Sequence, residues 1–213
     1  MRIAISFVGF LTAACASFPY STATDNILQL VGGSGTCTTW SVAPGWWLSA
    51  KHCEGYGAMS GWTIGGAEAT VVASSPTADL MLLRGPVVRS IPMATMQPPL
   101  GSAVVVLGYG MGRPTLLWFT GHVVSRESAF FLSHGDDAPV PQFLVSGFNG
   151  MPGMSGAPIT YRGQVVSQLS GGGLPHQHTQ LLSGGVLYAD LMAFVRQHVR
   201  APLPTDPPKT STP

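Results

Sequence analysis

Short apolar runs separated by glycine- and proline-rich turns are the feature that most limits the folds open to this chain. Its 213 residues include 27 Gly and 18 Pro, which interrupt the apolar runs before they reach helical length. Such runs between turn signals are typical of an all-β sandwich or barrel. The expected strands are residues 36–43, 45–50, 68–74, 80–85, 103–109, 116–125, 129–134, 142–147, 157–163, 164–170 and 185–190.

Helical periodicity is clear in one stretch, residues 189–199. Leu191 and Phe194 recur there at helical spacing behind Asp190, which is the expected N-cap. The sequence therefore predicts an all-β fold that ends in a short C-terminal helix.

A proline-rich connector, residues 88–101, divides the strands into two groups. We expect one domain over residues 27–200, built of two antiparallel β-barrels at about 27–85 and 100–188. The Pro/Thr-rich tail, residues 201–213, is predicted to be disordered.

Charge is sparse along the whole chain. Only 9% of the residues are charged, against about 25% in typical soluble domains, and the formal net charge is +1. No run of basic residues occurs. Because nucleic-acid binding depends on a concentration of positive charge, this composition argues against a nucleic-acid partner.

The N-terminus resembles an export signal. Residues 1–16 combine one arginine with an apolar stretch too short to span a membrane comfortably, followed by small residues. Two processing sites overlap: cleavage after Ala16, or cleavage before Cys15 at a lipobox-like sequence that would lipidate this cysteine. Residues 17–26 are then a short leader. We expect a secreted or periplasmic protein, bound to a membrane only if Cys15 is lipidated.

The cysteine content agrees with export. The chain has three cysteines, and processing removes or lipidates Cys15. Cys37 and Cys53 then remain as a pair for a disulfide in an oxidising compartment.

Ser155 stands in a glycine-rich turn, within the sequence GMPGMSGAPI. The stretch fits a tight turn between two strands, and it also fits a nucleophile. A nucleophilic serine needs accessible backbone N–H groups to hold a developing oxyanion, and the flanking Gly153 and Gly156 would leave them accessible.

Two further residues could complete a nucleophilic site. His52 follows the strand-like sequence GWWLSAK and precedes Cys53, and Asp79 opens the apolar run LMLL. A serine nucleophile requires a histidine base and a carboxylate that holds the base in the correct tautomer. Each residue alone also has a structural interpretation, as a histidine beside a disulfide or as an aspartate that ends a turn.

In this order the three segments WWLSAKHC, ADLMLL and GMSGAPI resemble the histidine, aspartate and serine motifs of chymotrypsin-like serine proteases. The resemblance covers about residues 30–198 and is nearest in style to compact bacterial and viral members. It implies a double β-barrel with the active site in the cleft between the barrels. His52 would be the general base and acid, Asp79 its orienting carboxylate and Ser155 the nucleophile.

The resemblance implies further site residues. The N–H groups of Gly153 and Ser155 would form the oxyanion hole. Ser170 matches the residue that accompanies the triad, and the following Gly171 and Gly172 match the edge that pairs with an extended polypeptide substrate. Asn149 matches the floor of the specificity pocket, where a neutral residue favours apolar or neutral side chains. Neither a cofactor nor a metal is implied.

Met154 departs from the digestive members of the family, which have an aspartate before the nucleophile. There the aspartate pairs with an N-terminal amine released by proteolysis. A thioether cannot accept that charge, so we expect a site that forms on folding.

Two other functions remain open. One is a catalytically silent, protease-like binding module. The other is a metal protein that uses His176 and His178, although no acidic or cysteine partner lies near them in the sequence. The function expected is that of an exported serine endopeptidase acting through an acyl-enzyme intermediate.

Overall fold

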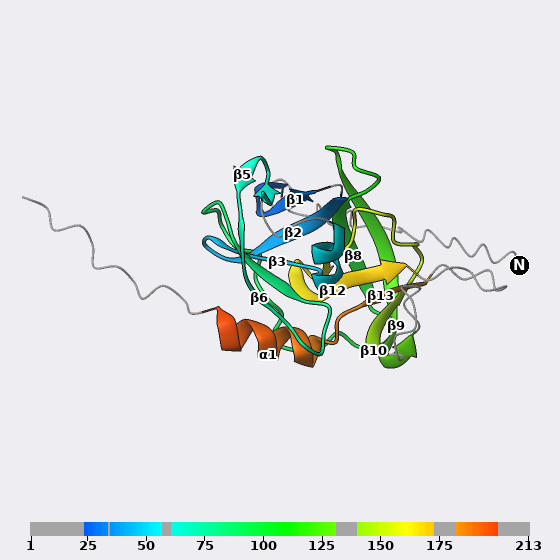
Figure 1. Ribbon diagram of the computed structural model, residues 1–213. Helices are drawn as coiled ribbons and strands as arrows, with labels where there is room; N and C mark the ends of the chain where they lie inside the picture. The colour runs from blue at the N-terminus through cyan, green and yellow to red at the C-terminus, as the bar shows by residue number, and fades with distance from the viewer. Residues whose placement is uncertain (1–23, 34, 57–60, 131–139, 173–181, 200–213) are drawn as a thin grey trace, which may run out of the picture.

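The computed structural model describes residues 24–33, 35–56, 61–130, 140–172 and 182–199. Two β units lie side by side, and a single helix, α1, lies along one end of them (Figure 1). The all-β class with a short C-terminal helix is thus confirmed. The expected leader up to residue 23, the tail, and the His176 and His178 pair lie outside the described residues.

The first unit is a seven-stranded antiparallel sheet in the order β5-β4-β1-β2-β3-β7-β6. Its strands are β1 (Ile27–Gly32), β2 (Gly35–Ala43), β3 (Trp46–Ser49), β4 (Thr63–Ile64), β5 (Ala67–Glu68), β6 (Thr70–Ser74) and β7 (Met81–Arg84). The edge strands β5 and β6 are separated by a single residue, so the sheet must curl until its two edges approach each other.

This first unit is the more open of the two expected barrels. No ladder closes the sheet among the described residues, so it forms a half-barrel. The strands at one edge are short, with two residues each in β4 and β5.

The second unit is a closed barrel in the order β10-β13-β12-β11-β8-β9. Its strands are β8 (Ala103–Tyr109), β9 (Leu116–Phe130), β10 (Val140–Ser146), β11 (Pro158–Tyr161), β12 (Gln164–Gly172) and β13 (Leu182–Gly185). Strand β9 continues through the expected break before residue 129, because it pairs along its length with β8 and β10.

The C-terminal helix α1 (Tyr188–His198) begins earlier than expected. Two interpretations of the sequence are corrected here. Residues 188–190 are helical rather than part of a strand, and Asp190 lies inside the first turn instead of capping it. Leu187 occupies the N-cap position and makes no side-chain capping hydrogen bond. The start of the helix is therefore set by packing, since Leu191 and Phe194 are buried in the core.

Three hydrophobic clusters form the core. One lies within the first unit around Trp47 and Trp62, and one within the second around Phe143 and Ile159. The third cluster joins both units to α1, and its buried members include Ile27, Trp40, Leu48, Leu80, Leu82, Val105, Leu107, Val165, Leu191 and Phe194. Burial of this shared cluster holds the two units against each other.

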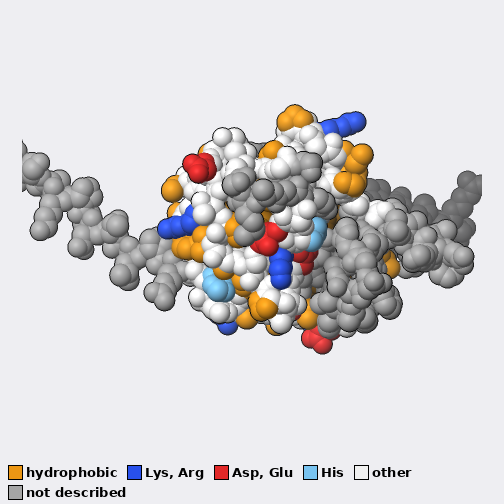
Figure 2. Space-filling model, viewed as in Figure 1, with side chains coloured by type: hydrophobic (Ala, Val, Ile, Leu, Met, Phe, Trp, Pro, Cys, Tyr) orange, Lys and Arg blue, Asp and Glu red, His pale blue; other side chains and the backbone are white. Residues whose placement is uncertain are grey.

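The surface agrees with the low charge of the sequence. In Figure 2 the acidic and basic side chains are scattered over the visible face, and no patch of one sign stands out. Among the described residues, no helix has the length and apolar character needed to cross a membrane.

Candidate active site

The first unit positions His52. Strand β3 ends at Ser49, and a 3-10 turn over Lys51–Tyr56 follows, with His52 near its start. The next residue, Cys53, forms a disulfide with Cys37 of β2, with an S–S distance of 2.02 Å. Both cysteines are buried. The turn that carries His52 is therefore covalently tied to the sheet.

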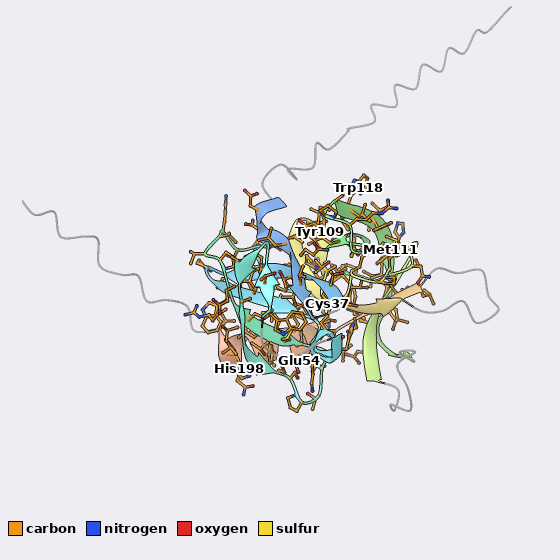
Figure 3. The ribbon with its side chains drawn as sticks, turned by 45° about the horizontal axis from the view of Figure 1, so that its top comes forward. Cys37, Glu54, Tyr109, Met111, Trp118 and His198 are labelled. Carbon is orange, nitrogen blue, oxygen red and sulfur yellow. A yellow bond between two sulfur atoms is a disulfide. The ribbon has the colours of Figure 1, made fainter. Side chains whose placement is uncertain are left out.

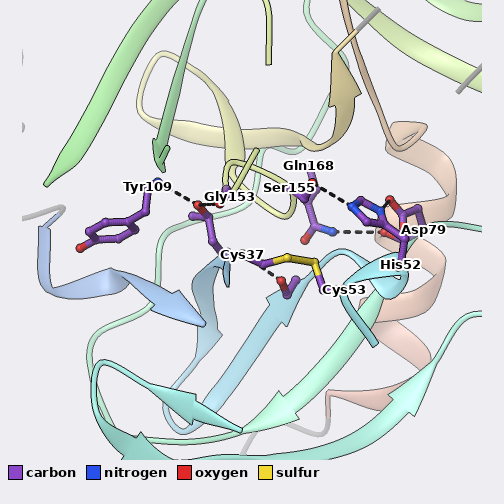
Figure 4. The surroundings of a disulfide bond; sticks show 10 residues. Cys37, His52, Cys53, Asp79, Tyr109, Gly153, Ser155 and Gln168 are labelled. Carbon is purple, nitrogen blue, oxygen red and sulfur yellow. Dashed lines mark hydrogen bonds and ion pairs between the residues drawn. A yellow bond between two sulfur atoms is a disulfide. The ribbon is translucent and has the colours of Figure 1, made fainter. Parts of the chain in front are cut away.

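Asp79 holds His52 through both of its carboxylate oxygens (Figure 4). Its Oδ1 accepts the backbone N–H of His52 at 2.9 Å, and its Oδ2 lies 2.7 Å from the ring nitrogen Nδ1. Because a carboxylate can only accept, Nδ1 carries the proton that it shares with Asp79. The two contacts fix both the orientation of the imidazole and its tautomer.

The pKa of the Asp79 carboxyl lies below its ordinary value of 3.8. Burial acts in the opposite direction and would raise this pKa. The hydrogen bonds from His52, the charge of His52 and a hydrogen bond from the Ser170 hydroxyl together outweigh that burial. Asp79 is therefore kept ionised beside the histidine.

Ser155 comes from the second unit, in the segment between β10 and β11. Its Oγ lies 2.8 Å from His52 Nε2. With the proton of the neutral ring on Nδ1, Nε2 accepts the hydrogen bond from the Ser155 hydroxyl. The structure thus brings Ser155, His52 and Asp79 into one hydrogen-bonded chain, although they lie 103 and 27 residues apart in sequence.

The backbone beside Ser155 leaves two N–H groups unused. The Met154 N–H donates to the Met151 carbonyl at 2.9 Å, and the Gly156 N–H donates to the Leu169 carbonyl at 2.8 Å. By contrast, the N–H groups of Gly153 and Ser155 have no acceptor among the described residues. These are the two donors expected to form an oxyanion hole.

Glycine is required on both sides of this segment. Gly153 and Gly156 have φ values of 92° and 87°, in the region that side chains other than glycine rarely adopt. A Cβ on Gly156 would also overlap the carbonyl oxygen of Thr38. The segment that carries Ser155 therefore lies closer to β2 than a residue with a Cβ at position 156 would allow.

The residues expected to bind substrate lie on and near β12. Ser170 is buried against Asp79, while Gly171 pairs with β13. Gly172 pairs with β13 as well. Strand β11 pairs with β12 as far as Gln168, and the backbone of Leu169 hydrogen-bonds to Gly156 and Ala157, so only beyond Leu169 does this edge of β12 lack a partner in the described part of the chain.

Asn149 lies six residues before Ser155 and is half-buried. Its carbonyl oxygen Oδ1 is buried and has no hydrogen-bond partner within the described ranges. The side chain therefore offers an uncharged acceptor near the segment that carries Ser155.

Sequence reasoning missed two polar residues that support the site. The fully buried Gln168 accepts a hydrogen bond from Trp40 Nε1 at 3.1 Å and donates to the Asp79 carbonyl at 3.3 Å. Thr38, also fully buried, donates its hydroxyl proton to the Gly153 carbonyl. Both residues stand in strands that contain other polar residues, such as Thr39 in β2 and Ser167 in β12, so no local signal in the sequence sets them apart.

Comparisons with known proteins agree with this architecture. No family model matches the chain. A Corynebacterium glutamicum protein named "Putative peptidase Cgl1093" is 28% identical over 162 residues, which are 70% of this chain and 58% of that protein. The chain thus matches less than two thirds of the length of this curated relative.

Solved structures resemble the chain more completely. The active form of the Rv3671c protease from M. tuberculosis has a TM-score of 0.67 and 22% identity, covering 88% of this chain and 87% of the other. The MamO protease domain from Magnetospirillum magneticum has a TM-score of 0.63 and 17% identity, covering 85% and 99%. A serine endoprotease from Yersinia pestis has a TM-score of 0.62 and 14% identity, covering 84% and 64%. The chain therefore has the chymotrypsin-like serine protease fold.

Proposed function

We propose that the protein is a serine endopeptidase whose catalytic residues are Ser155, His52 and Asp79. The observation that carries the proposal is the hydrogen-bonded chain, with 2.8 Å between Ser155 Oγ and His52 Nε2 and 2.7 Å between His52 Nδ1 and Asp79 Oδ2. The names of the structural neighbours and of the Corynebacterium glutamicum relative, all proteases or peptidases, support the same reaction class.

In this mechanism His52 Nε2 takes the Ser155 hydroxyl proton while Oγ attacks the carbonyl carbon of the scissile peptide bond. The N–H groups of Gly153 and Ser155 hold the oxyanion that develops. The imidazolium, stabilised by Asp79, then returns the proton to the leaving amine. The acyl group remains on Ser155 until water, deprotonated by His52, attacks the ester, and His52 then gives that proton to Ser155 Oγ as the acid product leaves.

The substrate binds as an extended polypeptide along β12. Support comes from the edge of this strand beyond Leu169, which lacks a partner strand in the described part of the chain and offers backbone groups at Ser170, Gly171 and Gly172. Strand pairing there would carry the scissile bond past Ser155.

Asn149 makes the specificity pocket neutral. An uncharged amide offers no counter-ion for Arg or Lys, so apolar or neutral side chains are preferred before the cleaved bond. Cleavage-site profiling on a peptide library tests this, with Ser155→Ala as the inactive control. Dominant cleavage after Arg or Lys would contradict the neutral pocket without affecting the proposed triad.

The enzyme works outside the cytoplasm. The disulfide between Cys37 and Cys53, and the signal-like residues 1–16, support this location. Mass spectrometry of the exported protein distinguishes a chain that begins at Ser17 from one that begins at a lipidated Cys15, and only the latter would be bound to a membrane.

The test of the proposed function is covalent labelling with a fluorophosphonate, combined with peptide hydrolysis by the purified protein. We expect labelling at Ser155, which is lost in Ser155→Ala and nearly lost in His52→Ala, with turnover reduced by about 10⁶-fold. A well-folded wild-type protein that neither labels nor hydrolyses peptides would support the silent binding module instead.

A further inference from the structure

Thr38 contacts the nucleophile segment with both its backbone and its side chain. This residue of β2 follows Cys37 and is fully buried. Its backbone N–H donates to the Ser155 carbonyl at 2.8 Å, and its own carbonyl accepts the hydroxyl of the buried Ser49 at 2.8 Å. Thr38, in the first unit, therefore holds the backbone of Ser155, in the second unit, through a hydrogen bond.

The Thr38 hydroxyl bridges two segments of the second unit. Oγ1 accepts the backbone N–H of Tyr109 at 2.9 Å and donates to the Gly153 carbonyl at 2.9 Å. A hydroxyl has one proton, and the Tyr109 N–H can only donate, so the proton must point to Gly153. The direction of the bridge is therefore determined.

A second donor holds the other side of Gly153. The backbone N–H of Met111, in the exposed turn between β8 and β9, donates to the Pro152 carbonyl at 2.7 Å. In a trans peptide the N–H points away from the carbonyl, so anchoring the Pro152 carbonyl aims the Gly153 N–H in the opposite direction. Figure 3 shows Met111 and Tyr109 on the same side of the molecule.

Glycine's freedom makes these two anchors necessary. With a φ of 92°, Gly153 has no side chain to limit rotation of the peptides on either side of it. We propose that the Thr38 hydroxyl, together with the Met111 N–H, positions Gly153 so that its N–H can serve the oxyanion hole. Thr38 is then a positioning residue that acts through Gly153, and this role rests on the proposed peptidase function.

The proposal predicts where the loss appears in the kinetics. An oxyanion forms only in the transition state, so a misdirected Gly153 N–H lowers kcat while KM changes little. Loss of one oxyanion donor typically lowers kcat by about 10²–10³-fold, and a loosened donor should cost less, about 10–100-fold. The hydrogen bonds between His52 and Asp79 are untouched, so the pH profile of kcat should keep its shape.

The main variant is Thr38→Val, which keeps the shape of the side chain and removes both hydroxyl contacts. Its matched control is Thr39→Val. Thr39 is the next residue of the same strand, is equally buried and donates to the Leu28 carbonyl at 3.1 Å, away from the nucleophile. We expect Thr38→Val to lower kcat about 10–100-fold, Thr39→Val to leave it near wild type, and Thr38→Ser to restore most of the rate.

Fluorophosphonate titration gives the number of active molecules, so that kcat is expressed per assembled site. An equal kcat for Thr38→Val and Thr39→Val, or a loss confined to KM, would overturn the positioning role. These outcomes require an active wild type, whereas an inactive wild type would overturn the proposed peptidase function instead.

If Thr38→Val does not fold, the same role is tested in the exposed turn. An amide-to-ester replacement at Met111, made with its α-hydroxy acid analogue, removes the N–H that holds Pro152; proline would not serve, because Met111 has a φ of 57°. Gly112→Ala strains the same turn, at a φ of 66°, but keeps that N–H. A kcat loss confined to the Met111 ester variant supports the inference, and equal kcat values in the two variants overturn it.

Discussion

Gly156 and Gly163 have similar backbone angles, with φ values of 87° and 76°, but very different surroundings. A Cβ on Gly156 would overlap the Thr38 carbonyl oxygen and press on Ser49, whereas a Cβ on Gly163 would meet nothing within 4 Å. Alanine at position 163 therefore tests backbone strain alone, whereas alanine at position 156 tests backbone strain together with steric overlap.

Gly163→Ala should lower the free energy of unfolding by about 1 kcal/mol, which is the cost of a positive φ. Gly156→Ala should cost several-fold more and abolish peptidase activity, because β2 and the nucleophile segment must move apart. Urea denaturation of both variants measures the difference. Similar losses of unfolding free energy in the two variants would mean that the backbone at Thr38 can move to make room for the added Cβ.

Asp79→Asn should lower kcat by about 10⁴-fold, because an amide can hold the wrong tautomer of His52. It should also change the dependence of stability on pH. The pKa of Asp79 is lower in the folded than in the unfolded protein, so ionisation stabilises the fold. This contribution is complete above the unfolded pKa of about 3.9 and is lost as the pH falls through the lower folded value.

Unfolding free energies measured between pH 6 and pH 2.5 check this expectation. The difference in unfolding free energy between wild type and Asp79→Asn should become smaller as the pH falls. Asp190→Asn, which changes an exposed carboxylate on α1, serves as the control. A gap that stays constant over this range would show that ionised Asp79 does not stabilise the fold.

At the residue scale, the sequence could identify Ser155, His52 and Asp79 as candidate catalytic residues, because each stands in a distinctive local pattern. It could not predict the roles of Thr38 and Gln168. Thr38 lies 115 residues from the carbonyl to which its hydroxyl donates, and Gln168 lies 128 residues from Trp40. Such contacts depend on how two sheets meet, which no local pattern describes.

At the scale of elements, the 3-10 turn over Lys51–Tyr56 is short and owes its position to the disulfide behind it. The bond closes a loop with a sequence separation of 16, which corresponds to about 3 kcal/mol of stabilisation. Because Cys53 follows His52 directly, the same bond also restrains the general base.

Replacing both Cys37 and Cys53 by Ala should therefore lower the free energy of unfolding by about 3 kcal/mol and reduce kcat. Reductant should lower the stability and activity of wild type but have no effect on the double variant. Unaltered kcat in a folded double variant would show that Asp79 alone orients His52.

Strands β1 and β4 were not expected, but most others were predictable to within a few residues, since apolar runs indicate them directly. The boundary between β13 and α1 was not. Residues 185–190 carry an apolar run that fits a strand. The helix nevertheless begins at Tyr188, because Leu191 and Phe194 are buried against the shared core. Tertiary packing outweighs the local preference there.

At the scale of the whole molecule, we expect the buried Met154 to decide how the proposed active site becomes active. Met154 has no exposed surface and packs in the core of the second unit with Ile159 and Leu169. A thioether in this position offers no partner for a buried ammonium group, so the site should not depend on a newly released N-terminus.

Mature protein that begins at Cys15 or Ser17 should therefore be active without further trimming. Its turnover, with the mass of the chain verified, should equal that of protein shortened to Ile27. Activity that appears only after shortening would reveal a proteolytic activation step and contradict this role of Met154.

The division into two units was predictable from the connector at residues 88–101, which forms no strand and only an isolated bridge, between Met93 and Val165. The closure of the units was not predictable. Whether a sheet closes depends on the lengths of its edge strands, and the two-residue strands β4 and β5 leave no sequence pattern of their own.

The boundary between the two units has a consequence for the chemistry. The Ser155 hydroxyl belongs to one unit and the accepting nitrogen of His52 to the other, so the proposed mechanism moves one proton from the second unit to the first during acylation and another in the reverse direction during deacylation. The reaction rate would then depend on the distance between the two units. A load that shifts them apart by a fraction of an ångström, applied far from any reacting atom, would slow the reaction just as a damaged active site does.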